Sequence, residues 1–529
     1  MIAALREPGR YAANGAGQAA ARLERVDLVE THISCVLLAG DYAYKIKKPV
    51  NLGFLDFTSL AARRFYCEEE VRLNRRTAPA LYLGVVAITG SASDPVVGGE
   101  GTPIDYAVKM RRFSQDVLLD GMARSGMLAT DCLDALGLRL AEFHQSLEPA
   151  RVERAYASPA QILDSAMQNF DQIRAVRGAA KGDDALAMLR SWTEREHARL
   201  AGEFEARKRD GFVRECHGDL HLGNIALLEG APTLFDCIEF NAAFRWIDVM
   251  NEVAFLVMDL EEHRLPKLAF RFLNNYLEVT GDYAGLRVLR FYSVYRALIR
   301  AKVVCIRGQQ PGAGAKARTR AGEEYAHYLR FAQAAAAAGR GALVIMHGLS
   351  GSGKTTLARR LAESLKAVHL RSDVERKRLH GLASLARTAS ALAGGVYAPQ
   401  DTERTYARLA DFARHAIASG YPAIVDASFL AARHRTLFRS LASDIGVPFA
   451  IASCAAPDEV LRERVGRRET EGVDASEAGL AVLERQFATQ EPFAGNESAD
   501  AVAFDSRDTD CASTAAAEAL ARRLGLMSR

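Results

Sequence analysis

Short runs in which apolar residues alternate with polar ones or cluster together dominate the first third of the chain, and this pattern is typical of strands. Strand-like runs are found at 31–40 ("THISCVLLAG"), 41–50 ("DYAYKIKKPV"), 81–89 and 104–113. The first two runs meet at Gly40 and Asp41, a pair that favours a hairpin turn. The beginning of the chain is therefore predicted to be rich in β-structure.

The apolar spacing becomes helical in the segment 131–147 ("DCLDALGLRLAEFHQSL"). The residues that recur there at intervals of three or four are Leu133, Leu136, Leu140, Phe143 and Leu147. Helical, charge-rich sequence then extends from about Ser158 to Arg209. A β-rich lobe followed by a helical lobe is the order of a protein kinase, so we expect an N-terminal α+β bilobal protein-kinase-like fold.

A second type of pattern begins after a Pro/Gly-rich break at 309–322 and a helical, alanine-rich segment. Apolar runs at 342–346, 423–427 and 449–455 alternate with helical segments. This alternation predicts an α/β P-loop NTPase fold with a parallel sheet. We therefore expect a first domain at 1–330, a linker at 331–340 and a second domain at 341–529.

The bulk composition agrees with a two-domain globular protein. A chain of 529 residues is too long for one ordinary core. The formal net charge of +3 is small, which disfavours a dedicated nucleic-acid binder. No apolar run is long enough for a membrane span, the first residues show no secretory pattern, and the eight cysteines form no CxxC pair. We therefore expect a cytoplasmic protein with no membrane partner.

The stretch "CHGDLHLGNIALLEGAPTLFDCIEF" at 216–240 has the residues that phosphoryl transfer from ATP requires. Asp219 can serve as the carboxylate near the acceptor hydroxyl. Asn224 and Asp236, the latter at the end of a strand-like run, can provide oxygen ligands for Mg²⁺ that bridges the phosphates. His217, by contrast, is interpreted as a structural loop residue, and His144 and His221 as packing or hydrogen-bonding residues.

Because of the motif formed by these residues, the segment from Val26 to Arg330 resembles the aminoglycoside phosphotransferase and choline kinase group. Members of this group are relatives of protein kinases. The resemblance implies a lysine on the third strand paired with a glutamate on the first helix. In "YAYK" we assign Lys45 to this role, with Lys47 as its rival on the same strand face. In "CEEEVRLN" we assign Glu70 as its partner, and Glu68 and Glu69 remain alternatives.

Two further expectations follow from this resemblance. No GxGxxG pattern precedes Lys45, which departs from the protein kinases, so the segment Thr31 to Ser34 is expected to cover the phosphates instead. In "RWIDVMNEVAF", Asp248 is expected to brace the catalytic loop.

The segment "GLSGSGKT" (348–355) matches the phosphate-binding pattern G-x-x-x-x-G-K-[ST] between an apolar strand and a helical segment. Backbone N–H groups and the N-terminus of the following helix would bind phosphates there. Lys354 would reach the β/γ-phosphates, and the Thr355 hydroxyl would bind Mg²⁺. The residues expected to contact the nucleotide are Gly348, Ser350, Gly351, Ser352, Gly353, Lys354, Thr355 and Thr356.

The residues after this loop indicate a kinase. Asp373, at the end of a predicted second strand, can approach an acceptor hydroxyl, and Arg376 can hold an anionic part of the acceptor. Asp426 is a candidate Mg²⁺-binding carboxylate, or alternatively a strand-end cap. The basic helical stretch at 459–472 carries arginines that can close over ATP. These are Arg462, Arg464, Arg467 and Arg468, of which Arg464 and Arg468 are assigned to the nucleotide; a solvated helix face is the alternative for Arg467 and Arg468.

The segment from Leu343 to about Leu524 resembles the zeta-toxin, gluconate-kinase and chloramphenicol-phosphotransferase-like P-loop kinases. The tandem order resembles bacterial fusions of an aminoglycoside phosphotransferase-like domain with an AAA-type ATP-binding domain. We expect ATP and Mg²⁺ at both sites of a bifunctional kinase that phosphorylates a small-molecule hydroxyl acceptor. The alternatives are one catalytic module regulated by a nucleotide-sensing module, or a C-terminal nucleic-acid or nucleotide-sugar kinase. The sequence specifies neither the acceptors nor the oligomeric state.

Overall fold

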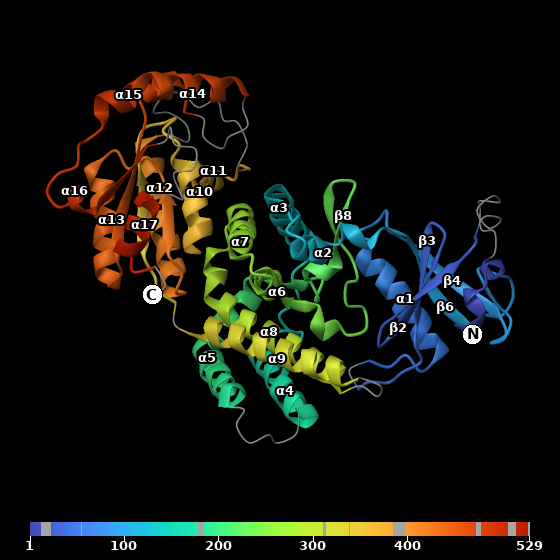
Figure 1. Ribbon diagram of the computed structural model, residues 1–529. Coiled ribbons are helices and arrows are strands. Elements are labelled where there is room, and N and C mark those ends of the chain that lie inside the picture. Colours follow the sequence, from blue (N-terminus) through green and yellow to red (C-terminus); the bar gives the residue numbers. More distant parts are fainter. Residues whose placement is uncertain are drawn as a thin grey trace. The chain divides into compact units, whose positions relative to one another are not determined.

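The computed structural model describes residues 1–11, 23–53, 55–177, 184–309, 314–337, 339–383, 398–471, 478–505 and 515–526 (Figure 1). Contacts group the chain into two compact units. The first unit comprises Met1–Ser165 and Phe204–Asp259, and the second comprises Ala166–Glu203 and Leu260–Arg529. This division does not fall at 331–340, because helices that precede the predicted linker pack with the C-terminal sheet. The boundary between the two sequence modules stays a prediction.

A six-stranded antiparallel sheet forms the N-terminal part of the first unit, in the order β1-β2-β3-β6-β4-β5. Its strands are β1 (Val26–Glu30), β2 (Ser34–Ala39), β3 (Tyr42–Lys47), β4 (Tyr82–Gly90), β5 (Pro95–Val97) and β6 (Asp105–Arg111). The predicted hairpin is confirmed, since β2 and β3 pair from Ala39 with Tyr42 around Gly40 and Asp41.

Helix α1 (Leu60–Asn74) packs on this sheet and presents Glu70. Its N-terminus is capped by Ser59, whose side chain accepts a hydrogen bond from the Ala62 N–H. Cys67 and Val71 of the helix join Tyr82 and Val108 of the strands in one buried cluster. This packing fixes the helix rotation and therefore the side chain that faces β3.

The remainder of the first unit is mainly helical, with two short two-stranded antiparallel sheets. The elements within this unit are α2 (Leu119–Arg124), α3 (Thr130–Ser146), β7 (Val213–Glu215), β8 (Ile225–Leu228), β9 (Ala231–Leu234) and β10 (Trp246–Asp248). β8 pairs with β9, and β7 pairs with β10. Three helices continue along the chain from one unit into the other: α4 (Pro159–Arg177), α5 (Asp184–Arg209) and α6 (Val249–Glu262). The β-rich lobe followed by helices confirms the predicted protein-kinase-like fold.

The second unit contains a five-stranded parallel sheet in the order β12-β13-β11-β14-β15. The strands are β11 (Leu343–His347), β12 (Val368–Arg371), β13 (Ala423–Asp426), β14 (Phe449–Ala455) and β15 (Ala501–Asp505). Its helices are α7 (Pro266–Thr280), α8 (Leu286–Gly308), α9 (Ala315–Ala336), α10 (Lys354–Leu365), α11 (Ser372–Leu379), α12 (Pro399–Ala418), α13 (Ala432–Ile445), α14 (Asp458–Glu471), α15 (Leu480–Thr489), α16 (Glu497–Asp500) and α17 (Ala515–Arg523).

The central strand of this sheet is buried on both faces. Leu343, Val344, Ile345 and Met346 are all fully buried, as expected for a parallel strand covered by helices. Side chains of α10 and α17 share one core cluster with this strand, whereas α13 packs on β11 and β14 and α12 packs on β12 and β13. The predicted α/β P-loop fold is confirmed, and β15 is a strand that the sequence pattern did not reveal.

Two further findings concern the described residues alone. None of their helices combines the length and the apolar character that crossing a membrane requires. The seven cysteines among them are free thiols, and all are buried.

Candidate active sites

The catalytic-loop candidates Asp219 and Asn224 lie together in the first unit. The Asn224 side-chain amide donates to the Asp219 backbone carbonyl at 2.9 Å and to its carboxylate at 3.3 Å. A 3-10 turn at Leu222–Asn224 brings the asparagine back toward the aspartate. His217 Nε2 contacts the Phe235 carbonyl at 2.8 Å, which agrees with the structural role predicted for this histidine.

Asp236 lies beside this loop because a backbone hydrogen bond joins the segment that follows Asp236 to the segment around His217. The Ile238 N–H donates to the His217 carbonyl at 3.1 Å, and the Asp236 N–H donates to the Tyr82 hydroxyl at 3.1 Å. Asp236 does not end a strand as predicted, since β9 stops at Leu234. It has a left-handed backbone with φ of 64°, a conformation that costs energy for a residue with a Cβ and that is concentrated at functional sites.

Lys45 and Glu70 form the ion pair that the family resemblance implied, with Lys45 Nζ 2.8 Å from a Glu70 carboxylate oxygen. Lys45 also pairs with Asp236, so this lysine links α1 to the metal-site candidate. The rival Lys47 binds the other Glu70 oxygen at 2.7 Å and the Glu239 carboxylate. Lys45 is thus the lysine beside Asp236, the candidate metal ligand, whereas Lys47 holds two buried carboxylates.

The alternatives to Glu70 point elsewhere. Glu69 pairs with Arg72 and Arg245, and Glu68 pairs with Arg64 in an exposed i,i+4 contact.

Burial and ion pairing shift the pKa values of the side chains in this cluster. Burial lowers the pKa of Lys45, but the carboxylates of Asp236, Glu70 and Glu239 outweigh it and hold that pKa well above its usual value. Burial raises the pKa of Glu70, yet Lys45 and Lys47 bring it down to about 2. Burial also raises the pKa of Glu239, although Lys47 pairs with this carboxylate. The Asp236 carboxylate and the Asn224 side-chain oxygen are the donors of this site that fit Mg²⁺, which prefers oxygen ligands.

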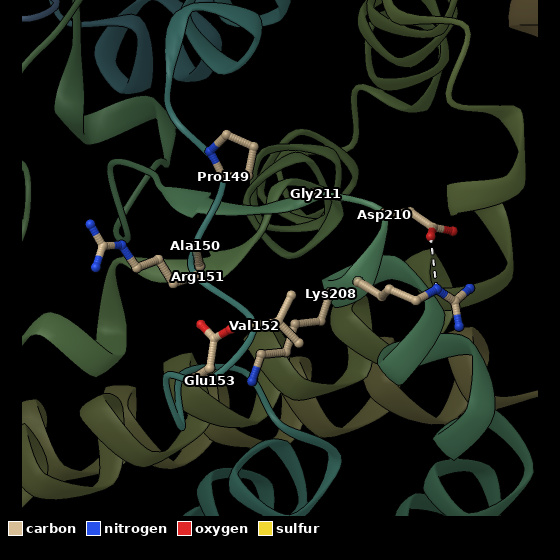
Figure 2. A pocket seen from close by; sticks show the side chains of 9 residues that line it. Pro149, Ala150, Arg151, Val152, Glu153, Lys208, Asp210 and Gly211 are labelled. Carbon is tan, nitrogen blue, oxygen red and sulfur yellow. Dashed lines mark hydrogen bonds and ion pairs between the residues drawn. The ribbon is translucent and has the colours of Figure 1, made fainter.

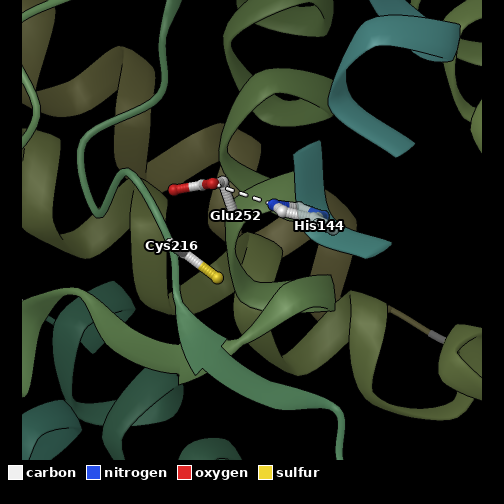
Figure 3. Close-up of side chains that lie close together, drawn as sticks. All are labelled: His144, Cys216 and Glu252. Carbon is white, nitrogen blue, oxygen red and sulfur yellow. Dashed lines mark hydrogen bonds and ion pairs between the residues drawn. The ribbon is translucent and has the colours of Figure 1, made fainter. Parts of the chain in front are cut away.

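The side chain that braces the catalytic loop is Glu252 of α6, which sequence reasoning missed (Figure 3). Its two oxygens accept the backbone N–H groups of His217 at 3.1 Å and Gly218 at 2.6 Å, and His144 Nε2 at 3.0 Å. Burial raises the pKa of Glu252, but the His144 contact and these donors lower it to about 2. Asp259 further binds the Leu222 N–H at 2.8 Å.

Asp248, predicted to brace the loop, contacts two residues outside that loop. Its carboxylate pairs with the buried Arg207 at 2.6 Å and accepts the Met250 N–H at 2.8 Å. Asp248 therefore anchors the end of α5 and the start of α6.

His144, Cys216 and Glu252 lie close enough together to resemble a metal site (Figure 3). The Glu252 oxygens, however, already accept three N–H groups. Burial also raises the pKa of the Cys216 thiol well above its usual value, so the thiolate that a metal would need is disfavoured. This cluster is a structural brace of the loop.

The phosphate loop between β11 and α10 has the backbone that its glycines permit. Gly348 has φ of 141°, and a Cβ there would lie 2.4 Å from the Cys454 carbonyl oxygen. Gly353 has φ of 79° and precedes the first turn of α10. The loop therefore leads directly into a helix N-terminus, where N–H groups and the helix dipole favour an anion.

Two polar groups of this loop are bound within the protein. Lys354 Nζ donates to the Leu349 carbonyl at 2.7 Å. The backbone N–H of Ser350 donates to the side-chain oxygen of Gln486 on α15 at 2.8 Å. A phosphate that binds Ser350 must displace this amide, so Gln486 is a further candidate residue of the nucleotide site, which the sequence did not indicate.

The other candidates of the C-terminal site converge on the loop. Thr355 donates its hydroxyl to the carboxylate of Asp426, which ends β13 as predicted. Burial lowers the pKa of Lys354, and the negative charges of Asp426 and Asp373 partly oppose this shift. The two carboxylates are therefore near enough to act on the charge of the lysine. Asp373 belongs to the first turn of α11, beyond the strand end where it was predicted.

The arginines of α14 have different surroundings. Arg464 donates to the carbonyl of Gly351 in the phosphate loop at 3.4 Å, and Arg468 donates to the Ala478 carbonyl at 2.7 Å. Burial is the main cause that lowers the pKa of Lys354, and the positive charge of Arg468 lowers it further. Arg468 therefore lies near the phosphate loop. Arg462 pairs with Glu484 in an exposed contact. Nucleotide contacts of Arg464 and Arg468 stay predictions.

A cavity of about 790 Å³ lies in the first unit (Figure 2). It is lined by Pro149, Ala150, Arg151, Val152, Glu153, Lys208, Arg209, Asp210 and Gly211. Both charge signs are present, and Arg209 pairs with Asp210 at 3.1 Å. None of these residues belongs to the predicted catalytic or ATP-binding set, so the cavity is not assigned to an acceptor.

Comparisons with known proteins agree with this organisation. Residues 343–493 match the model of a family described as AAA domain. The chain is 30% identical over 462 residues to "Uncharacterized protein Rv2004c" of Mycobacterium tuberculosis, covering 87% of this chain and 90% of that protein.

Two solved structures are similar to part of the chain. A gluconokinase from Sinorhizobium meliloti 1021 is 23% identical and covers 36% of this chain and 93% of its own, with a TM-score of 0.24. A choline kinase from Cryptosporidium parvum Iowa II is 10% identical and covers 63% of this chain and 95% of its own, with a TM-score of 0.40.

The catalytic loop beside Asp236, the phosphate loop and the matched AAA domain define the class of this protein as an ATP-dependent kinase. A protein-kinase-like part precedes a P-loop kinase-type domain in the same chain. The chain belongs to the family of the mycobacterial protein to which it is 30% identical over most of both lengths.

Proposed function

We propose that the protein is a bifunctional small-molecule kinase with two ATP–Mg²⁺ sites, each of which transfers a γ-phosphoryl group to a hydroxyl acceptor. One observation supports this proposal: each half of the chain holds a lysine near metal-type oxygen ligands, and a further aspartate lies beside Asn224 in one half and acts on the charge of Lys354 in the other. A domain that only bound nucleotide would have no need for the last of these groups.

In the N-terminal site, Asp219 would orient the acceptor hydroxyl and accept its proton. Asn224 and Asp236 would hold Mg²⁺, which neutralises phosphate charge when it is bound. Lys45, held near Asp236 by Glu70, would bind the phosphates of ATP. The Glu252 contacts support this assignment because they fix the loop that carries Asp219.

In the C-terminal site, the phosphate loop and Lys354 would bind the phosphates, while Thr355 and Asp426 would hold Mg²⁺. Asp373 would orient the acceptor, and Arg464 or Arg468 would stabilise charge in the transition state. We propose a cytoplasmic location and a small-molecule acceptor, supported by the free thiols among the described residues and by the small net charge.

The experiment is a screen of metabolite extracts with labelled ATP, using the intact chain and variants of each site. Two phosphorylated products, each lost with a different variant, support two kinases. A single product that survives changes in one site supports the alternative, in which that site senses nucleotide and regulates the other.

A further inference from the structure

Helix α7 contacts the free edge of the parallel sheet through Asn274. The Asn274 side-chain nitrogen donates to the Ala367 carbonyl at 2.9 Å, and its oxygen accepts the His369 N–H at 2.8 Å. A neighbouring strand would offer the same donor and acceptor to β12, which is the edge strand of this sheet. The buried amide of Asn274 therefore satisfies part of the edge of β12, beyond which the described residues add no further strand.

The same helix also holds the end of β12 and the helix that follows it. Arg371 pairs with Glu278 of α7 at 2.7 Å, and Arg378 donates to the Glu278 backbone carbonyl. Asp373, the candidate acceptor carboxylate, lies between these two arginines in sequence. Helix α11 is thus attached to α7 at both ends, through Arg371 just before its first turn and through Arg378 in its last turn.

His369 extends this contact into the candidate metal site. Its backbone binds Asn274, and its Nε2 lies 3.3 Å from a carboxylate oxygen of Asp426 on the neighbouring strand. Both side chains are buried. Asp426 in turn accepts the hydroxyl of Thr355. A hydrogen-bonded row therefore runs from α7 through β12 and β13 to the phosphate loop.

We propose that Asn274 and His369 are positioning residues for the C-terminal kinase site, and that they orient Asp426 for Mg²⁺ through β12. The inference rests on the proposed function of the phosphate loop. It adds that this site depends on a helix encoded ahead of the predicted boundary at 331–340. Partners of metal-binding carboxylates typically change metal affinity by about 10–100-fold when they are removed.

The test measures equilibrium binding of a fluorescent ATP analogue by the full-length chain as Mg²⁺ is titrated. All variants carry Asp236→Ala, which removes the metal carboxylate of the other site, and Lys354→Ala in this background defines the loss of phosphate-loop binding. His369→Phe should raise the Mg²⁺ concentration at half-maximal binding by about 10–100-fold. His369→Gln, which retains a donor, should restore part of this affinity, and Asn274→Ala should shift it in the same direction by a smaller factor.

The exposed Lys267→Ala change on α7 is the matched control and should leave the Mg²⁺ midpoint unchanged. Nucleotide binding without Mg²⁺ should stay within about twofold in every positioning variant, a result that general loss of structure would not give. Circular dichroism checks folding, and Asn274→Ala carries the test if His369→Phe does not fold. An unchanged Mg²⁺ midpoint in the folded variants overturns the inference. If Lys354→Ala retains Mg²⁺-dependent binding in this background, the proposed function of the loop itself is wrong.

Discussion

Lys45 lies 2.8 Å from Glu70, so the third strand of the N-terminal sheet and its first helix are joined by a buried ion pair. Lys47, two residues further along the same strand face, binds the other oxygen of the same carboxylate. The two lysines therefore share one partner but have different second partners. Lys45 reaches Asp236, whereas Lys47 reaches Glu239.

Different consequences are expected from removing each lysine. Lys45→Met should lower phosphoryl transfer by the N-terminal site by about 10²–10³-fold, as loss of one preorganised charged donor does. Lys47→Met leaves Glu239 buried without its cation and should destabilise the fold by about 3–5 kcal/mol. Steady-state rates and urea denaturation of both variants measure this contrast. Equal losses of activity and stability in the two variants would contradict the distinct roles.

Glu252 should make stability depend on pH in a defined window. Its folded pKa of about 2 lies below the ordinary value of 4.5, so its stabilising effect is complete above about pH 4.5 and is lost as the pH falls toward 2. Glu252→Gln should therefore lower stability near neutral pH by about 3 kcal/mol, and the difference from the unaltered protein should shrink below about pH 4.5. Urea midpoints across this pH range measure the effect.

The exposed Glu68→Gln change on α1 is the control for this experiment, since Glu68 pairs only across the helix surface with Arg64. It should change stability by less than about 1 kcal/mol at any of these pH values. A Glu252→Gln protein as stable as the unaltered one at neutral pH would show that Glu252 does not brace the loop.

Gln486 should compete with the nucleotide for the phosphate loop. Its side chain occupies the Ser350 N–H, and a hydrogen bond of this type contributes about 0.5–1.5 kcal/mol. Gln486→Ala should therefore bind an ATP analogue about two- to tenfold more tightly, whereas Gln490→Ala at the exposed end of α15 should not. Weaker binding by Gln486→Ala would mean that this amide contacts the nucleotide favourably.

Local patterns predicted much of both sites, because backbone geometry and short motifs are encoded by neighbouring residues. The hairpin at Gly40 and the phosphate loop from Gly348 to Thr355 are examples, and the structure agrees with both. The position of Asp426 at the end of β13 followed from the same reasoning.

Contacts between distant segments could not be predicted in this way. Glu252 meets Gly218 only because α6 packs beneath the catalytic loop, and no local pattern distinguishes it from other helical glutamates. His369 meets Asp426 because β12 and β13 are neighbours, and the strand order of a parallel sheet is not readable from alternating apolar runs. The pairing of Asp248 with Arg207 could not be predicted for the same reason, since it joins the end of β10 to α5, and the bracing role of Asp248 stays a prediction.

The claim that both halves are kinases is tested most directly by replacing the two acceptor carboxylates separately. Asp219→Asn and Asp373→Asn nearly preserve shape, so folding and ATP binding should remain. Labelled products of the intact chain are then compared for the unaltered protein and each variant. Each change should reduce one phosphorylation product by about 10²–10⁴-fold and leave the other nearly intact. If either change alters no product at all, that half binds or senses nucleotide and the protein is not a double kinase.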